Sequence, residues 1–210
     1  MCWNQYVSLN TFLFSTFVLG LMMYNDRYTP YKTTLTNNVF FYFFILSFAS
    51  MQLIEYFLWK NINNKKAVQT ISVWGQLLIL LQPVASLLML KNEGLKAVML
   101  LAYVIPFGLL FLTSTKKYTT TVRNGHLHWD WMPFTVFTEC AWLFFLFFSF
   151  VVNGYYPYFL AALALFVLSY WSYHKNGTMG SLWCWSINLF MFYFAVQLLI
   201  VLPFQEHGVC

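Results

Sequence analysis

The sequence predicts an all-α integral membrane protein, a bundle of seven transmembrane helices joined by short loops. Of its 210 residues, 60% are hydrophobic, 22% are aromatic and only 8% are charged, whereas an ordinary soluble domain has roughly 25% charged residues. A soluble fold of this length could not cover its surface with so few charges. Long apolar runs support the same class, because a helix needs about 20 apolar residues to cross a hydrocarbon core about 30 Å thick.

Seven apolar runs, separated by polar breaks rich in Asn, Gly and Pro, predict the spans. The first run has no basic residue before it and no small-residue cleavage site after it, so we expect a membrane helix rather than a signal peptide. Barrel strands would alternate apolar and polar residues, whereas FLAALALFVLSYW is apolar on every side. We expect residues 1–210 to form a single polytopic domain with spans at 6–24, 39–59, 68–90, 97–114, 132–152, 155–174 and 181–203.

Six tryptophans lie near the predicted ends of these spans. Amphipathic rings of this kind settle among lipid headgroups. We therefore expect interfacial positions for Trp59, Trp129, Trp131, Trp171, Trp183 and Trp185.

Lysine and arginine predict the orientation. The side with the amino terminus and the second, fourth and sixth loops holds Lys60, Lys65, Lys66, Lys116, Lys117, Arg123 and Lys175. The opposite side holds Arg27, Lys32, Lys91 and Lys96. The positive-inside rule then predicts a cytoplasmic amino terminus and a carboxyl terminus that is outside or lumenal. Because the basic residues are scattered, the net charge of +5 does not indicate a nucleic-acid partner.

The stretch MQLIEYFLWKN, residues 51–61, places a carboxylate in an apolar helix. With a rise of 1.5 Å per residue, Glu55 lies about 7 Å, and Gln52 about 12 Å, from the Lys60 end of this helix. Ionisable groups are rare within membrane spans and often mark functional sites. Glu55 is therefore the first candidate site residue.

Polar side chains on four other predicted helices point to the same membrane side. They are Gln69, Ser72, Gln76 and Pro83 in the third helix, Thr135, Glu139, Trp142 and Ser149 in the fifth, Tyr170 and His174 in the sixth, and Ser181, Trp185 and Asn188 in the seventh. We expect a polar cavity about 10 Å deep, open to the more basic side. Its predicted lining is Glu55, Glu139, Gln52, Gln76, Asn188 and His174.

A purely structural interpretation of these groups stays open. A glutamate near a helix end can extend its carboxylate to the interface. Amides such as those of Gln76, Gln82 and Asn188 often join membrane helices by hydrogen bonds.

The segment HLHWDWMPF raises the question of a metal site. His126, His128 and Asp130, together with Glu55, Glu139 and His174, would supply nitrogen and oxygen ligands for zinc or iron. We take an H-x-H pair in extended backbone to direct its two rings to opposite sides, which disfavours the site. No cofactor is therefore predicted, and a metal at His126, His128 and Asp130 stays an alternative.

Motifs for other chemistry are missing from the sequence. It contains no G-x-S-x-G elbow and no glycine-rich phosphate loop. Residues 181–203 contain no lysine for a retinal Schiff base of the opsin type. The four cysteines form no C-x-x-C pair, and Cys140 and Cys184 are expected as small apolar side chains within helices. These features favour a non-enzymatic function without deciding it.

Three elements of the sequence carry a family resemblance: Gln52-x-x-Glu55-x-x-x-Trp59, Gln82-Pro83, and GSLWCW from Gly180 to Trp185. They resemble an uncharacterised multi-pass, seven-helix membrane protein family of large DNA viruses and single-celled eukaryotes. The resemblance covers most of the chain. It implies a multi-pass fold and no known activity.

Three functions follow from these patterns. The first is a small transporter or channel-like protein, in which Glu55 and Glu139 bind an ion, a proton or a polar solute. The second is a membrane-embedded, metal-dependent enzyme acting on lipid. The third is a non-catalytic scaffold or receptor-like protein. The expected partners are the lipid bilayer and either a second copy of the chain or other membrane proteins.

Overall fold

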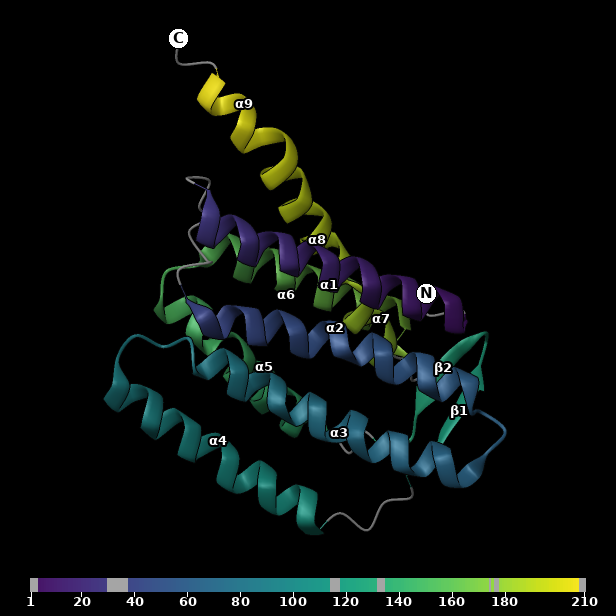
Figure 1. Cartoon of the computed structure of the whole chain (residues 1–210). Coiled ribbons are helices and arrows are strands. Elements are labelled where there is room, and N and C mark those ends of the chain that lie inside the picture. The colour runs from purple at the N-terminus through teal and green to yellow at the C-terminus, as the bar shows by residue number, and fades with distance from the viewer. Residues whose placement is uncertain are drawn as a thin grey trace.

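The computed structural model describes residues 4–29, 38–113, 118–131, 135–173, 175 and 178–207, and these are mostly helical. Figure 1 shows the long helices side by side, with α4 at one edge and α8 and α9 at the other. The elements are α1 Gln5–Tyr28, α2 Val39–Lys60, α3 Lys65–Leu87, α4 Glu93–Thr113, β1 Thr120–Arg123, β2 His126–Trp129, α5 Val136–Val152, α6 Tyr156–Tyr173, α7 Met179–Trp185, α8 Ile187–Val196, a π-helical turn Gln197–Val201, and α9 Leu202–His207.

Each predicted span coincides with a helical segment, and the ends differ by a few residues. By length and composition, five segments are long and apolar enough to cross a membrane: α1, α2, α3, α4 and the stretch Met179–Phe204. These five make the chain a multi-pass helical membrane protein. Helix α5 has only 17 residues, fewer than the roughly 20 that a perpendicular span requires, and α6 carries tyrosines at both ends. Membrane crossing by all seven segments stays a prediction.

The polar breaks define where helices begin. Asparagine and threonine side chains at the N-cap accept hydrogen bonds from backbone N–H groups that the first helical turn leaves unpaired. Asn4 accepts from Tyr6 and Val7 at 2.9 and 3.0 Å. Asn38, Asn64 and Thr135 do the same at the starts of α2, α3 and α5. The asparagine-rich breaks thus act as helix starts as well as turns.

Pro83 in the middle of α3 creates a link to the neighbouring helices. A proline has no N–H, so the carbonyl of Ile79, four residues earlier, loses its helical partner. The indole Nε1 of Trp142 on α5 donates to this carbonyl at 3.1 Å. The hydroxyl of Tyr103 on α4 donates to the next carbonyl, that of Leu80, at 2.9 Å. The proline therefore frees the carbonyl that ties α3 to α5, and the Leu80 carbonyl adds a hydrogen bond from α4.

The all-α prediction is wrong between the fourth and fifth helices. Strands β1 and β2 pair antiparallel there, from Thr120 opposite Trp129 to Arg123 opposite His126. The turn residues Asn124 and Gly125 have φ angles of 51° and 75°, as a two-residue hairpin turn requires. An Asn-Gly pair between two short runs of β-forming residues indicates a hairpin, and this signal was not used when the segment was predicted to be a loop. In Figure 1 the hairpin lies at one end of the bundle, beside the ends of α2 and α3.

The last predicted span is not one continuous helix. Helix α7 ends at Trp185, and Ser186 forms a turn before α8. The Ser186 hydroxyl donates to the carbonyl of Trp183 at 2.6 Å. A π-helical turn interrupts the helix again at Gln197–Val201. A single apolar run gives no sign of such a break, because its composition is the same on both sides.

Helix α2 holds the centre of the bundle. It packs against α1, α3, α7 and α8, whereas α4 packs mainly against α3. Only Tyr103 and Phe107 of α4 are buried. The two polar residues of the predicted site on α2 are therefore surrounded by other helices.

Candidate functional site

The predicted carboxylate of α2 lies in the interior. Glu55 and Gln52, one helical turn apart, are both 0% exposed. Glu55 is within electrostatic range of the Cys184 thiol on α7, and the side chain of Gln82 on α3 reaches the same thiol. Residues from three helices that are distant in the sequence thus converge around Cys184.

A pocket of about 320 Å³ lies next to this cluster. Its lining comes from α3, β2, α5, α6 and α7, and consists of Ile79, Gln82, Trp129, Glu139, Trp142, Phe166, Met179, Gly180, Trp183 and Cys184. We call it the polar pocket, because Gln82, Glu139 and Cys184 form part of its wall. Glu139 is half-buried at the start of α5. Glu139 thus contributes to the pocket lining from α5, whereas Glu55 lies beside Cys184 and outside that lining.

Several polar groups of this pocket lack a well-aligned hydrogen bond with the described residues, although the Gln82 amide lies within reach of the Cys184 thiol. Gln82 is 0% exposed, yet neither its amide oxygen nor its amide nitrogen makes a hydrogen bond of good geometry. The indole N–H groups of Trp129 and Trp183 are also buried and form no hydrogen bond with the described residues. Each unsatisfied buried polar group costs about 1–3 kcal/mol. These polar atoms are thus buried within the wall of the pocket, whose accessible surface is mostly apolar.

The β-hairpin is fixed over the pocket by polar contacts and close packing. Trp131 Nε1 donates to Thr120 Oγ1 at 3.0 Å, and Thr120 Oγ1 is 3.0 Å from Ser72 Oγ on α3. Trp131 is 1% exposed, and a Cβ placed on Gly75 would lie 3.0 Å from its ring. The Trp131 ring stacks on that of Trp129 with centroids 5.1 Å apart. The hairpin is therefore docked directly on α3.

This docking changes two expectations from the sequence. The predicted cavity has Gln52 and Glu55 in its lining, whereas both are fully buried and lie outside the lining of the polar pocket, to which the hairpin contributes Trp129. Trp129, Trp131 and Trp183 were expected among headgroups, but all three are buried. Their rings pack on a glycine, on each other and on phenylalanines, which removes them from the interface. Trp171, by contrast, is 84% exposed.

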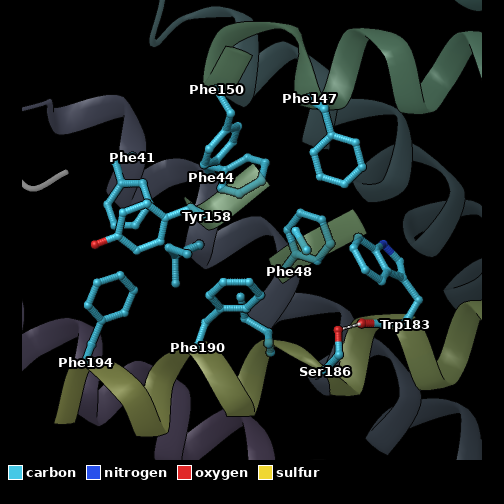
Figure 2. Close-up of a pocket in the computed structure, with 13 residues that line it drawn as sticks. Phe41, Phe44, Phe48, Phe147, Phe150, Tyr158, Trp183, Ser186, Phe190 and Phe194 are labelled. Carbon is cyan, nitrogen blue, oxygen red and sulfur yellow. Dashed lines mark hydrogen bonds between the residues drawn. The ribbon is translucent and has the colours of Figure 1, made fainter. Parts of the chain in front are cut away.

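Trp183 forms the opposite wall of the polar pocket. Its ring meets those of Phe48, Phe147 and Phe166 edge-on, at centroid distances of 5.9, 6.3 and 5.3 Å. Beyond it lies a second cavity, shown in Figure 2, to which Trp183 also contributes. The indole thus separates a polar pocket from an aromatic cavity.

Other predicted site residues lie elsewhere. Asn188 on α8 accepts from Ser15 Oγ of α1 at 3.3 Å and donates to the Trp185 carbonyl at 3.0 Å, so it joins helices as the structural interpretation proposed. Gln76 is buried on α3 and does not line the polar pocket. His174 lies outside the described residues.

The hairpin also corrects the geometry assumed for the metal site. His126 and His128 alternate with buried Leu127 and Trp129, because residues two apart on a strand share one face. His128 Nδ1 lies 2.9 Å from Asp130 Oδ1, and the His126 ring packs against that of Tyr173. Burial lowers the pKa of His126. Among the residues that the structure describes, no group of three His, Cys, Asp or Glu side chains could hold a metal ion.

Four residues of the pocket were not assigned to it from the sequence. Gln82 was weighed as a packing amide, Cys184 as a small apolar side chain, and Trp129 and Trp183 as interfacial rings. Periodicity within one helix reveals a polar face, but it does not show which faces of different helices meet.

No protein-family model, curated protein or solved structure matches the chain. The family resemblance based on Gln52, Glu55, Gln82 and the GSLWCW segment stays a prediction. Function therefore has to be inferred from the geometry of the polar pocket.

Proposed function

We propose that this protein is a small membrane transport protein that carries a proton or a small cation, with or without a polar solute, through the polar pocket. The observation that supports it is the fully buried Glu55 beside a pocket whose described lining contains Glu139 and no lysine, arginine or histidine. A carboxylate removed from water is stabilised by a proton, by a cation or by hydrogen bonds.

Packed side chains on two sides of the pocket favour a carrier over a continuous pore. The hairpin covers one side through Trp129, and Trp183 with its ring neighbours Phe48 and Phe147 blocks the other. A guest bound between two barriers is released only when one of them moves. The break at Ser186 beside Cys184 supports the same interpretation, because many transporters build their binding sites from discontinuous helices.

The proposal includes the topology predicted from the sequence. All seven helical segments would cross the membrane, with the hairpin on the more basic, cytoplasmic side. The shorter α5 and α6 would do so in a locally thinned bilayer, at a cost of fractions of a kcal/mol per Å of mismatch. The pocket would then open to the cytoplasm when the hairpin moves away from α3.

Electrical recordings from reconstituted protein test the proposal. Proteoliposomes on a solid-supported membrane are exposed to jumps in proton, sodium and potassium concentration, and the transient currents are compared between variants. We expect Glu55→Gln to reduce the current about tenfold or more, since it removes a fully buried carboxylate beside the pocket. Glu139→Gln should reduce it less, because Glu139 is only half-buried.

The matched control is Glu93→Gln. Glu93 is exposed at the start of α4, where its carboxylate pairs with Lys96 at 2.7 Å. The same change of charge at this position should leave the current at the wild-type value. Equal currents for wild type and Glu55→Gln would refute the role given to Glu55.

A further inference from the structure

A second cavity lies beyond Trp183, in the half of the bundle away from the hairpin. It lies between α2, α5, α6, α7 and α8. Nine of its 13 lining residues are aromatic, and Figure 2 shows rings from each side facing its centre. We call it the aromatic chamber.

The aromatic chamber continues into a crevice on the surface. Helices α6 and α8 flank this crevice of about 990 Å³, and Tyr158 and Phe190 belong to the lining of both spaces. On α8, Leu189 and Tyr193 of the crevice are 48% and 45% exposed. Both lie within the apolar stretch Met179–Phe204, which is long enough to cross a membrane. The crevice therefore faces the hydrocarbon of the bilayer.

The chemistry of the lining restricts what can enter. No charged residue is among the described residues that line the chamber or the crevice. The hydroxyl of Ser186 already donates to the Trp183 carbonyl at 2.6 Å. Figure 2 shows the Tyr158 hydroxyl pointing away from Phe48 and Trp183. An ion or a sugar would lose its hydration here without replacement, whereas a hydrocarbon chain would lose nothing.

We propose that the aromatic chamber binds one hydrocarbon chain of a membrane lipid, which enters from the bilayer through the crevice between α6 and α8. The bilayer is the source because the opening lies at membrane depth and is flanked by apolar side chains. Phe41 and Phe194 close the chamber at one end with ring centroids 5.9 Å apart, and Trp183 closes it at the other. This site goes beyond the proposed transport function and does not depend on Glu55.

Photocrosslinking in vesicles tests the proposal. The protein is reconstituted in phosphatidylcholine vesicles containing a small fraction of phosphatidylcholine with a diazirine near the end of one acyl chain. After irradiation, adducts are mapped by mass spectrometry of peptides. We expect adducts on the rings of Tyr158, Phe190 and Phe194, since these contact the chain inside the chamber.

Two substitutions on α6 provide a matched pair. Ala162 lines the chamber, so Ala162→Phe fills it and should reduce these adducts about tenfold, the effect of a tenfold weaker affinity. Ala164, two residues along the same helix, is exposed and lines neither space, so Ala164→Phe should leave them unchanged. Unchanged adducts in Ala162→Phe, or adducts confined to outward-facing residues of wild type, overturn the proposal.

Tyr158→Ala gives an independent test, in case Ala162→Phe does not fold. Removing this ring widens the passage between crevice and chamber, so adducts on Phe190 and Phe194 should increase. Adducts at or below the wild-type amount would contradict entry through this crevice.

Discussion

The two halves of the bundle interior are equally buried but differ in chemistry. Next to the hairpin, Gln52, Glu55 and Gln82 are each 0% exposed. Beyond Trp183, the core consists of rings such as Phe41 and Phe150, at 2% and 5% exposed. Burial alone therefore does not distinguish the two halves. The chemistry of the buried groups does, because carboxylate and amide groups suit a cation and aromatic rings suit a hydrocarbon chain.

The two halves should also differ in how they affect stability. Edge-on ring pairs contribute about 0.5–1.5 kcal/mol beyond burial of their area, so the aromatic half stabilises the fold. Unsatisfied amides and indoles cost about 1–3 kcal/mol each, so the polar half destabilises it. Removing a side chain should therefore have opposite consequences in the two halves.

The largest effect is expected at the boundary. Trp183→Ala removes a ring that contacts Phe48, Phe147 and Phe166, and we expect it to lower the free energy of unfolding by about 3–5 kcal/mol. Trp171→Ala is the control, because its ring is 84% exposed. Unfolding by sodium dodecyl sulfate in mixed micelles, followed by circular dichroism, measures both. Similar losses for the two variants would contradict the boundary role of Trp183.

The second largest effect on stability is expected for substitutions at the contact between the hairpin and α3. A Cβ on Gly75 would meet the Trp131 ring at 3.0 Å and the Ile54 side chain at 3.2 Å. Gly75→Ala should therefore cost about 1–3 kcal/mol and expose the hairpin to proteolysis. Gly108→Ala has nothing within 4 Å of the new Cβ, so it should stabilise α4 by up to about 1 kcal/mol. Faster proteolytic cleavage of the hairpin in Gly108→Ala than in Gly75→Ala would show that the contact between Trp131 and Gly75 does not fix the hairpin on α3.

A substitution in the polar half should have the opposite sign. Gln82→Leu removes a buried amide whose one polar contact is with the Cys184 thiol and is not a well-aligned hydrogen bond, so we expect it to stabilise the fold by about 1–2 kcal/mol while it reduces the transport current. Gln69→Leu, on the exposed surface of the same helix, should change neither by a comparable amount. The same denaturation assay and the same recordings apply. A loss of stability in Gln82→Leu would mean that the amide is a structural hydrogen-bonding group.

The smallest expected effect concerns pH and the hairpin. Burial lowers the pKa of His126, so the folded state favours the neutral ring. The neutral ring therefore contributes its full stabilisation above the usual histidine pKa of about 6.5. This contribution is lost as pH falls through the lower pKa that His126 has in the folded state. The neighbouring groups are Tyr173, Arg123, His128 and Asp130. Hydrogen exchange of residues 120–129, corrected for the intrinsic pH dependence, should show less protection in acid. His126→Gln should weaken this dependence, and an unchanged profile would exclude His126 as its source.

The sequence was sufficient for the elements that depend on composition along the chain. Seven apolar runs located the helical segments, and Glu55 stood out because carboxylates are rare in such runs. The sequence was less informative about side chains whose surroundings depend on how different helices pack. Asn188 and Ser181 were assigned to one face of a predicted helix, yet Asn188 bonds to Ser15 of α1.

The hairpin was missed for a different reason. Its signal, Asn124-Gly125, was present, but the flanking tryptophans suggested an interfacial loop. Only the fold shows that Trp131 fits over Gly75 and that Trp129 becomes a wall of the polar pocket. A glycine in an apolar helix is ordinary, so neither residue indicates the other in the sequence.

The central claim is that Glu55 binds a proton or a cation beside the polar pocket. Infrared difference spectroscopy of the reconstituted protein, recorded as pH or cation concentration is changed, tests this most directly through the carboxyl C=O stretch. We predict a C=O band that responds to the titration in wild type, Glu139→Gln and Glu93→Gln, and that disappears in Glu55→Gln. A responding band that persists in Glu55→Gln with the wild-type amplitude would contradict the claim.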